Sequence, residues 1–213
     1  MTVQLWGYCH SVYSWIAHAV LHEKNIEHEW LEVNPFIGDQ PSEWKAVSPF
    51  NRVPVLVCGE LSIYETAAIT RYADEAFGPP SLQPADPLAR ARMNQIISIV
   101  DSYVYVPLVR RVFAHRVYRP AVNQPFDESK IGEGLSAAPR ALSALEDLAQ
   151  SPFLISEAPS LADFHLAPML DYFAAAPEGA ALLGQHTRLS QWLERMSTRP
   201  SLTDTRPTLP HER

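Results

Sequence analysis

The pattern of apolar residues changes near residue 80, and this change most constrains what the chain can fold into. Before it, short strand-like runs alternate with helical patterns; the runs are residues 3–6, 29–33, 53–57 and 61–64. After it only helical periodicity is found, over residues 88–117, 127–150, 161–173 and 189–196. Because four prolines, at 79, 80, 84 and 87, separate the two patterns, the sequence predicts two domains of different class.

The first domain shows the order βαβ followed by ββα, with Gly59-Glu60 as a hairpin turn. This order predicts a small α/β unit of thioredoxin size, with helices packed on a sheet. We expect it to occupy residues 1–80, followed by a linker at 81–87 and an all-helical domain at 88–213. The fold class is therefore α/β plus all-α.

Prolines are also expected to shape the second domain, since the chain has 19 prolines and 8 glycines. Pro107 and Pro139 fall inside long helical patterns, which they are expected to kink or split. The tail after Pro200 is rich in proline and threonine, and we expect it to run over the surface.

Composition excludes several classes of function. A net charge of −7 and the lack of a basic stripe argue against nucleic-acid binding. The longest apolar stretch is broken by Asp101 and Pro107 and is too short to span a membrane, and the N-terminus lacks the features of a signal peptide. Cys9 and Cys58 lie far apart without metal-ligand spacing, so neither a disulfide framework nor a metal site is expected. We expect a soluble, cytoplasmic protein.

Val53-Pro54 opens a predicted strand directly after a loop. Proline cannot donate to a sheet ladder, so it belongs at a strand's start or in a special turn. A cis bond here would turn the Val53 N–H and C=O outward, free to pair with an extended peptide-like ligand. An ordinary trans proline at a strand start explains the local sequence as well.

Glu65 and Thr66 mark a junction where a strand ends and a helix begins. The N–H groups at a helix N-terminus bind an anion well, and the Thr66 hydroxyl adds a donor, while Glu65 can bind an ammonium group. The pair suits the two charged ends of an amino acid. Simple capping of the helix is the alternative.

The segment from Tyr8 to Ser14 leaves the first strand and enters the first helix with several hydroxyl groups. Such hydroxyls are usually helix caps. One of them could instead hydrogen-bond a bound thiolate, together with the helix dipole. Lowering a thiol pKa from about 8.5 by two units takes roughly 2.7 kcal/mol, which is of the right order for these two effects.

Together these motifs resemble the cytosolic glutathione transferase family, of a bacterial and serine-class type, from Val3 to about Pro207. Its N-terminal pattern appears as Ser11 followed by Leu21-His22-Glu23-Lys24-Asn25, with asparagine where the family has glycine. Its other motifs appear as Ser48–Leu56, Glu65–Ile69, Pro159–Pro168 and Trp192–Met196. In the third of these, Ser160 and Asp163 form a capping box, which we interpret as structural.

The resemblance implies a glutathione-binding site in a thioredoxin-like domain, with glutathione as co-substrate and no metal. It assigns Ser11 to activation of the glutathione thiol, with Tyr13 and Cys9 as reserves. It places the cysteinyl backbone on Val53 beside a cis Pro54, and the γ-glutamyl end on Glu65 and Thr66. Gln40 and Arg52 are weaker candidates for the glycyl carboxylate.

For the second substrate, the resemblance implies a small-molecule electrophile bound against the first long helix, in a detoxification reaction. Tyr103 and Arg110 recur there at helical spacing and would suit a flat or anionic molecule, although such stripes also form cores. The alternatives are a glutathione-dependent isomerase or dehalogenase of zeta type, and a non-catalytic binding protein with this fold. Family members are usually homodimers, and no membrane or nucleic-acid partner is implied.

Overall fold

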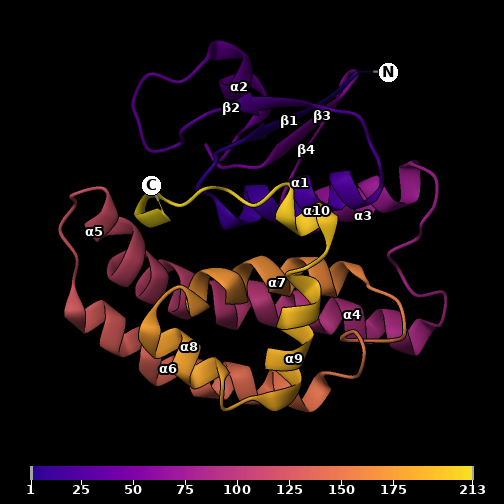
Figure 1. Cartoon of the computed structure of the whole chain (residues 1–213). Coiled ribbons are helices and arrows are strands. Elements are labelled where there is room, and N and C mark those ends of the chain that lie inside the picture. The colour runs from indigo at the N-terminus through magenta and orange to yellow at the C-terminus, as the bar shows by residue number, and fades with distance from the viewer. Residues whose placement is uncertain (1, 213) are drawn as a thin grey trace. The chain divides into compact units, whose positions relative to one another are not determined.

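The computed structural model describes residues 2–212 and divides the chain into two compact units (Figure 1). Unit 1 comprises the described residues up to Leu82 together with Pro200–Pro207, and unit 2 comprises Gln83–Arg199 together with the described residues from Thr208 onward. The segment Pro200–Pro207 therefore belongs to unit 1, although helical residues of unit 2 precede it in the sequence.

Unit 1 is built on a four-stranded sheet in the order β2-β1-β3-β4. Its strands are β1 (Val3–Gly7), β2 (Glu29–Glu32), β3 (Val55–Cys58) and β4 (Leu61–Tyr64). Strand β2 runs parallel to β1, whereas β3 and β4 are antiparallel to their neighbours. The β3–β4 turn uses Gly59 at a φ of 63°, which glycine adopts without a steric penalty. The predicted hairpin is therefore confirmed.

Helices α1 (Val12–Glu23) and α3 (Thr66–Ala76) pack against each other on one side of this sheet (Figure 1). A short helix α2 (Ser42–Val47) precedes β3 and was not predicted. Its one buried side chain is Trp44, which is too little to produce a helical pattern in the sequence. The resulting order βαβαββα confirms the thioredoxin-like class of the N-terminal domain.

The C-terminal end of α1 is fixed by a buried ion pair. Lys24 Nζ lies 3.1 Å from Asp74 Oδ1 and donates to the Pro80 carbonyl at 2.6 Å. The same carboxylate oxygen accepts a hydrogen bond from Leu82 N at 2.7 Å. Asn25 follows at a φ of 52°, a left-handed conformation that asparagine tolerates at a helix end. In the Leu21–Asn25 motif, Lys24 therefore forms the buried ion pair and Asn25 ends the helix.

All the secondary-structure elements in the described part of unit 2 are helices, and loops join them. A continuous helical stretch is formed by α4 (Pro87–Ile99), the π-type helix η1 (Val100–Tyr118) and α5 (Arg119–Ala121). It is followed by α6 (Glu128–Leu148), α7 (Leu161–Ala174), α8 (Pro177–Leu183), α9 (Thr187–Met196) and the 3₁₀ turn η2 (Pro210–Glu212). Helix α7 is buried on almost every face and packs against α4, η1, α8 and α9.

Neither proline splits its helix, contrary to one of the two expected outcomes. Pro107 lies within η1 and Pro139 within α6. These two helices pack closely. At Gly134 of α6 there is no room for a side chain, since a Cβ there would lie 2.6 Å from the Pro107 carbonyl oxygen. Packing of this extent outweighs the roughly 3 kcal/mol that an interior proline costs.

No helix within residues 2–212 is both long enough and apolar enough to cross a lipid bilayer.

Candidate active site

The register of the sheet in unit 1 brings the three predicted motifs to the same end of the sheet, where β1 and β4 end and β3 begins. Trp6 pairs with Val55, so the residues that follow β1 lie beside Val53-Pro54. Val55 in turn pairs with Tyr64, which places Glu65 next to Pro54 at the same end of the sheet. The segment after β1 thus meets residues more than forty positions later in the sequence at this end of the sheet.

Ser11 is the N-cap of α1, with extended backbone at φ −86° and ψ 117°. Its Oγ accepts a hydrogen bond from Ser14 N at 3.2 Å, and its carbonyl accepts one from Trp15 N at 3.0 Å. The capping alternative is therefore realised. Because the hydroxyl acts here as an acceptor, its proton remains available to a bound group, and the accepted bond polarises it as a donor.

The electrostatics at this helix end favour an anion. In α1 as the structure describes it, the first turn contains no acidic residue. The positive end of the helix dipole is therefore not neutralised within its own first turn. A thiolate near the Ser11 hydroxyl would gain from both the hydrogen bond and the dipole.

The two reserve residues occupy different places in the same loop. Tyr13 is half-buried in the first turn of α1. Cys9 is exposed and is not part of a disulfide, and its backbone N donates to Glu32 Oε1 at 3.0 Å. The second oxygen of that carboxylate accepts from Trp30 Nε1 at 2.9 Å. Glu32 therefore ties the loop to β2.

Val53-Pro54 is a cis peptide in the structure, as the family resemblance implied. Pro54 is buried, and Val53 is half-buried just before β3.

Glu65 is the N-cap residue of α3, but its side chain makes no capping hydrogen bond. Its carboxylate is exposed, and its backbone has a φ of 69° and a ψ of 115°, which is rare for a residue with a Cβ. Thr66 follows as a buried residue in the first turn. Simple capping by Glu65 is therefore not what the structure shows, and its carboxylate faces solvent at a helix N-terminus.

Gln40 and Arg52 differ in what their side chains do. The Gln40 amide nitrogen donates to the carbonyls of Asn34 and Ile37, which closes the loop after β2. Arg52 is exposed, and its backbone N and O both bond the Ser48 hydroxyl. The Gln40 amide is thus engaged locally, whereas the Arg52 guanidinium lies at the surface.

Tyr103 and Arg110 lie on η1 in unit 2, and both are exposed; Tyr103 shows 66% of its surface. On the same helix, Asp101 Oδ1 lies 2.9 Å from Nε2 of the buried His165.

The predicted capping box of α7 is present and fully enclosed. Asp163 Oδ2 accepts from the backbone N and the hydroxyl of Ser160, at 2.7 and 2.8 Å. Its Oδ1 accepts from Leu154 N and Trp192 Nε1, at 2.9 and 2.8 Å. Burial raises the pKa of Asp163, and these four hydrogen bonds oppose that rise. The interpretation of this box as structural is consistent with its contacts.

Among residues 2–212, no group of three or more histidine, cysteine or acidic side chains is arranged to hold a metal ion.

Two family models match the chain. The N-terminal domain of glutathione S-transferase matches residues 10–76, and its C-terminal domain matches residues 119–195. The chain belongs to the glutathione S-transferase family. The motif-based resemblance is thereby confirmed at the level of the family, including its N- and C-terminal domains.

Relatives of known name agree with this membership. The chain is 29% identical over 188 residues to glutathione S-transferase F14 of Arabidopsis thaliana, covering 85% of this chain and 74% of the relative. It is 27% identical to a glutathione S-transferase of Hyoscyamus muticus, over 86% of this chain and 87% of the relative. The structure of glutathione transferase F7 from Populus trichocarpa superposes with a TM-score of 0.83, at 24% identity over 96% and 97% of the two chains. This last similarity supports the fold.

Two side chains that hold the loops of this candidate site were not predicted to do so. Glu32 lies on a strand whose alternation is visible in the sequence, and the Trp30/Glu32 spacing places both side chains on one face. Ser14 Oγ accepts from Tyr8 N at 3.2 Å, which closes the loop from inside. Neither bond has a sequence signature of its own.

Proposed function

We propose that this protein is a glutathione transferase of the serine type, in which the Ser11 hydroxyl stabilises the thiolate of bound glutathione. Family membership supports glutathione as the co-substrate. The observation that carries the proposal is the state of Ser11, whose oxygen accepts from Ser14 N while its proton is left to donate at the N-terminus of α1.

Three neighbouring positions are proposed to hold the tripeptide. The backbone of Val53, beside cis Pro54, pairs with the cysteinyl residue. The exposed Glu65 carboxylate binds the γ-glutamyl ammonium group, and the α3 N-terminus with Thr66 binds its carboxylate. Of the two candidates for the glycyl carboxylate, we favour Arg52, because the Gln40 amide already donates to two carbonyls.

The proposed reaction begins with loss of the glutathione thiol proton to solvent. The sulfur electron pair then attacks an electrophilic carbon, a carbon–sulfur bond forms, and the leaving group departs with its bonding electrons. The residues supply thiolate stabilisation and proximity. Tyr103 and Arg110, both exposed on η1, are the proposed contacts of a flat or anionic electrophile. We further propose a homodimer, which analytical ultracentrifugation tests.

Ser11→Ala tests the proposal, with Ser11→Thr as the variant that retains a hydroxyl. In the alanine variant we expect the pKa of the bound glutathione thiol to rise by about 1 to 2, and turnover at neutral pH to fall about tenfold to a hundredfold. The thiolate ultraviolet absorbance and a panel of electrophiles measure these two quantities. An unchanged thiol pKa would refute the role of Ser11, and corresponding losses in Tyr13→Phe or Cys9→Ala would transfer that role.

The same panel separates the alternative functions. Isomerisation or dehalogenation without accumulation of a conjugate would indicate the zeta-type reaction. Failure to bind immobilised glutathione, with no turnover of any electrophile, would indicate a binding protein that keeps the fold.

A further inference from the structure

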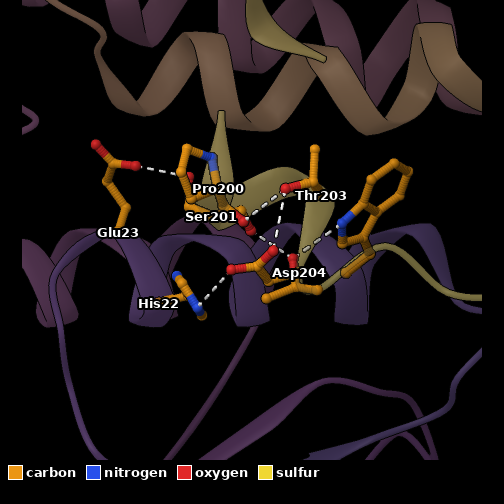
Figure 2. A network of polar contacts seen from close by, with 8 residues as sticks. His22, Glu23, Pro200, Ser201, Thr203 and Asp204 are labelled. Carbon is orange, nitrogen blue, oxygen red and sulfur yellow. Dashed lines mark hydrogen bonds and ion pairs between the residues drawn. The ribbon is translucent and has the colours of Figure 1, made fainter. Parts of the chain in front are cut away.

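The segment Pro200–Pro207 packs along α1 within unit 1, and we call it the C-terminal strap. It contains the short helix α10 (Pro200–Thr203), which lies against α1 (Figures 1 and 2). The strap was expected to run over the surface, yet Ser201, Leu202 and Thr205 are buried. The two buried hydroxyls, of Ser201 and Thr205, both form hydrogen bonds with side chains of α1.

The first attachment joins Thr205 to Trp15. The Trp15 indole Nε1 donates to Thr205 Oγ1 at 3.1 Å, and Thr205 Oγ1 donates to the Ser201 carbonyl at 2.6 Å. Trp15 is 4% exposed and Thr205 is 8% exposed. Both polar atoms would lose a buried partner if this bond were removed, so the bond fixes the indole strongly.

The second attachment lies two turns further along α1, at its C-terminal end. Ser201 Oγ donates to Glu23 Oε2 at 2.6 Å. His22 Nε2 lies 3.7 Å from Asp204 Oδ2 (Figure 2). Because the strap holds α1 near both ends, rotation or sliding of this helix would break contacts at both.

Trp15 connects the strap to the proposed thiol-activating residue. Its backbone N donates to the Ser11 carbonyl at 3.0 Å, which is the first hydrogen bond of α1. The residue whose indole is held by Thr205 therefore also fixes the backbone of the N-cap. Hydroxyl position matters in such a site, since displacements of about 1 Å weaken a catalytic hydrogen bond markedly.

We propose that Thr205 is a positioning residue for Ser11, acting through the Trp15 indole. This inference rests on the proposed function of Ser11. Loss of the Thr205 hydroxyl removes the hydrogen bond that holds the Trp15 indole, so the N-cap backbone that Trp15 binds is less fixed. The Ser11 hydroxyl then donates less often to the glutathione sulfur. The binding groups around Glu65 and Val53 belong to other elements and are not affected directly.

Thr205→Val removes the hydroxyl with little change in shape, Thr205→Ser keeps it, and Thr203→Val is the matched control. Thr203 is exposed on the same strap and bonds only nearby groups, the Pro200 carbonyl and Asp204 Oδ1, among its described contacts. In Thr205→Val we expect the pKa of the bound glutathione thiol to rise by about 0.5. We expect kcat to fall about threefold to tenfold, with KM for glutathione changed less than about twofold. Thr205→Ser and Thr203→Val should match the unmodified protein.

Trp15→Phe provides an independent variant, because it removes the donor of the same bond while keeping an aromatic ring. Its effect on kcat should equal that of Thr205→Val, and the double variant should be no worse than either one. Additive effects would overturn the inference. An unchanged thiol pKa and kcat in Thr205→Val, with the shift present in Ser11→Ala, would overturn the positioning role alone. No shift in Ser11→Ala would overturn the proposed function itself.

Discussion

Serine is the N-cap residue of both α1 and α7, and these two N-termini differ in what the serine hydroxyl proton does. At α7, Ser160 is 2% exposed and donates its hydroxyl proton to Asp163, the acid three residues on. At α1, Ser11 is half-buried, and the residue three positions on is Ser14, whose backbone N bonds the Ser11 oxygen. The same cap chemistry therefore yields a closed structural junction in unit 2 and a hydroxyl with an available proton in unit 1.

The difference shows that the residue at the third helical position decides between the two outcomes. An acid at this position accepts the hydrogen bond of the cap hydroxyl, and its charge offsets the positive end of the helix dipole. Without it, the helix end keeps a positive potential and a donor, which suits a bound anion. The described first turn of α3 also lacks an acid, but the N-cap residue of this helix is itself the acidic Glu65.

The largest effect is expected from Asp163→Ala, which leaves four buried donors without their acceptor. We expect the free energy of unfolding to fall by about 3 to 4 kcal/mol, since breaking a buried polar network is costly. Urea denaturation measures the change. Asp163→Asn, which keeps one acceptor oxygen, should cost less, and a loss below about 1 kcal/mol in the alanine variant would show that the network is not central.

Exchanging each serine for alanine should separate stability from activity. Ser160→Ala should lower the free energy of unfolding by about 1 to 2 kcal/mol and leave kcat unchanged. Ser11→Ala should lower kcat at neutral pH at least about tenfold, at a smaller cost in stability. Urea denaturation and steady-state kinetics on both variants test this, and equal loss of activity in both would end the distinction between the two caps.

Glu65→Gly should reveal the backbone strain at the N-cap of α3. Glycine adopts a φ of 69° freely, so relief of backbone strain should raise the free energy of unfolding by about 1 kcal/mol. Loss of the carboxylate should weaken glutathione binding about tenfold. Thermal unfolding and calorimetric titration measure the two changes. Glu65→Ala is the control, because it loses the carboxylate but keeps the strain; equal stability of both variants would contradict the strain.

The smallest effect is expected on the pH dependence of stability, through His18 on α1. Burial, together with the nearby His28 and His22, lowers the pKa of His18 from 6.5 to about 4. The folded protein therefore binds fewer protons than the unfolded chain between these values, and stability falls as pH decreases through them. We expect a loss of about 1 kcal/mol after allowance for solvent screening.

His18→Phe keeps a ring against Trp30, whose centroid lies 5.1 Å from that of His18, and should flatten this part of the pH profile. Unfolding titrations across the acidic range compare the two proteins. An unchanged slope would assign the acid sensitivity elsewhere.

Much of the fold was predictable because strong local patterns agreed with the tertiary structure. Strands β1 to β4 and helices α1, α3, α7 and α9 lie where alternation and helical periodicity predict them. The short helices α2 and α8 were missed, since six or seven residues with one or two buried side chains leave no period to detect. Splitting at Pro107 and Pro139 was wrong because interhelical packing overrides the local penalty.

The site divides in the same way. Ser11, Val53-Pro54 and Glu65 stand at element boundaries, and the strand register brings them to one edge. The Gln40 amide donates to two carbonyls of its own loop. The path of that loop could not be predicted from the periodicity of apolar residues. The bond between Trp15 and Thr205 joins residues 190 positions apart, so no local pattern could indicate it.

The strap also affects how the chain folds as it is synthesised. The strands and helices of unit 1 are translated first, but residues 200–207 complete that unit. The helix carrying Ser11 thus gains its contacts with the strap only when residues 200–207 have left the ribosome. A nascent N-terminal unit would keep the strap-binding face of α1 uncovered throughout the synthesis of unit 2, in the period when chains are most exposed to aggregation and chaperone binding.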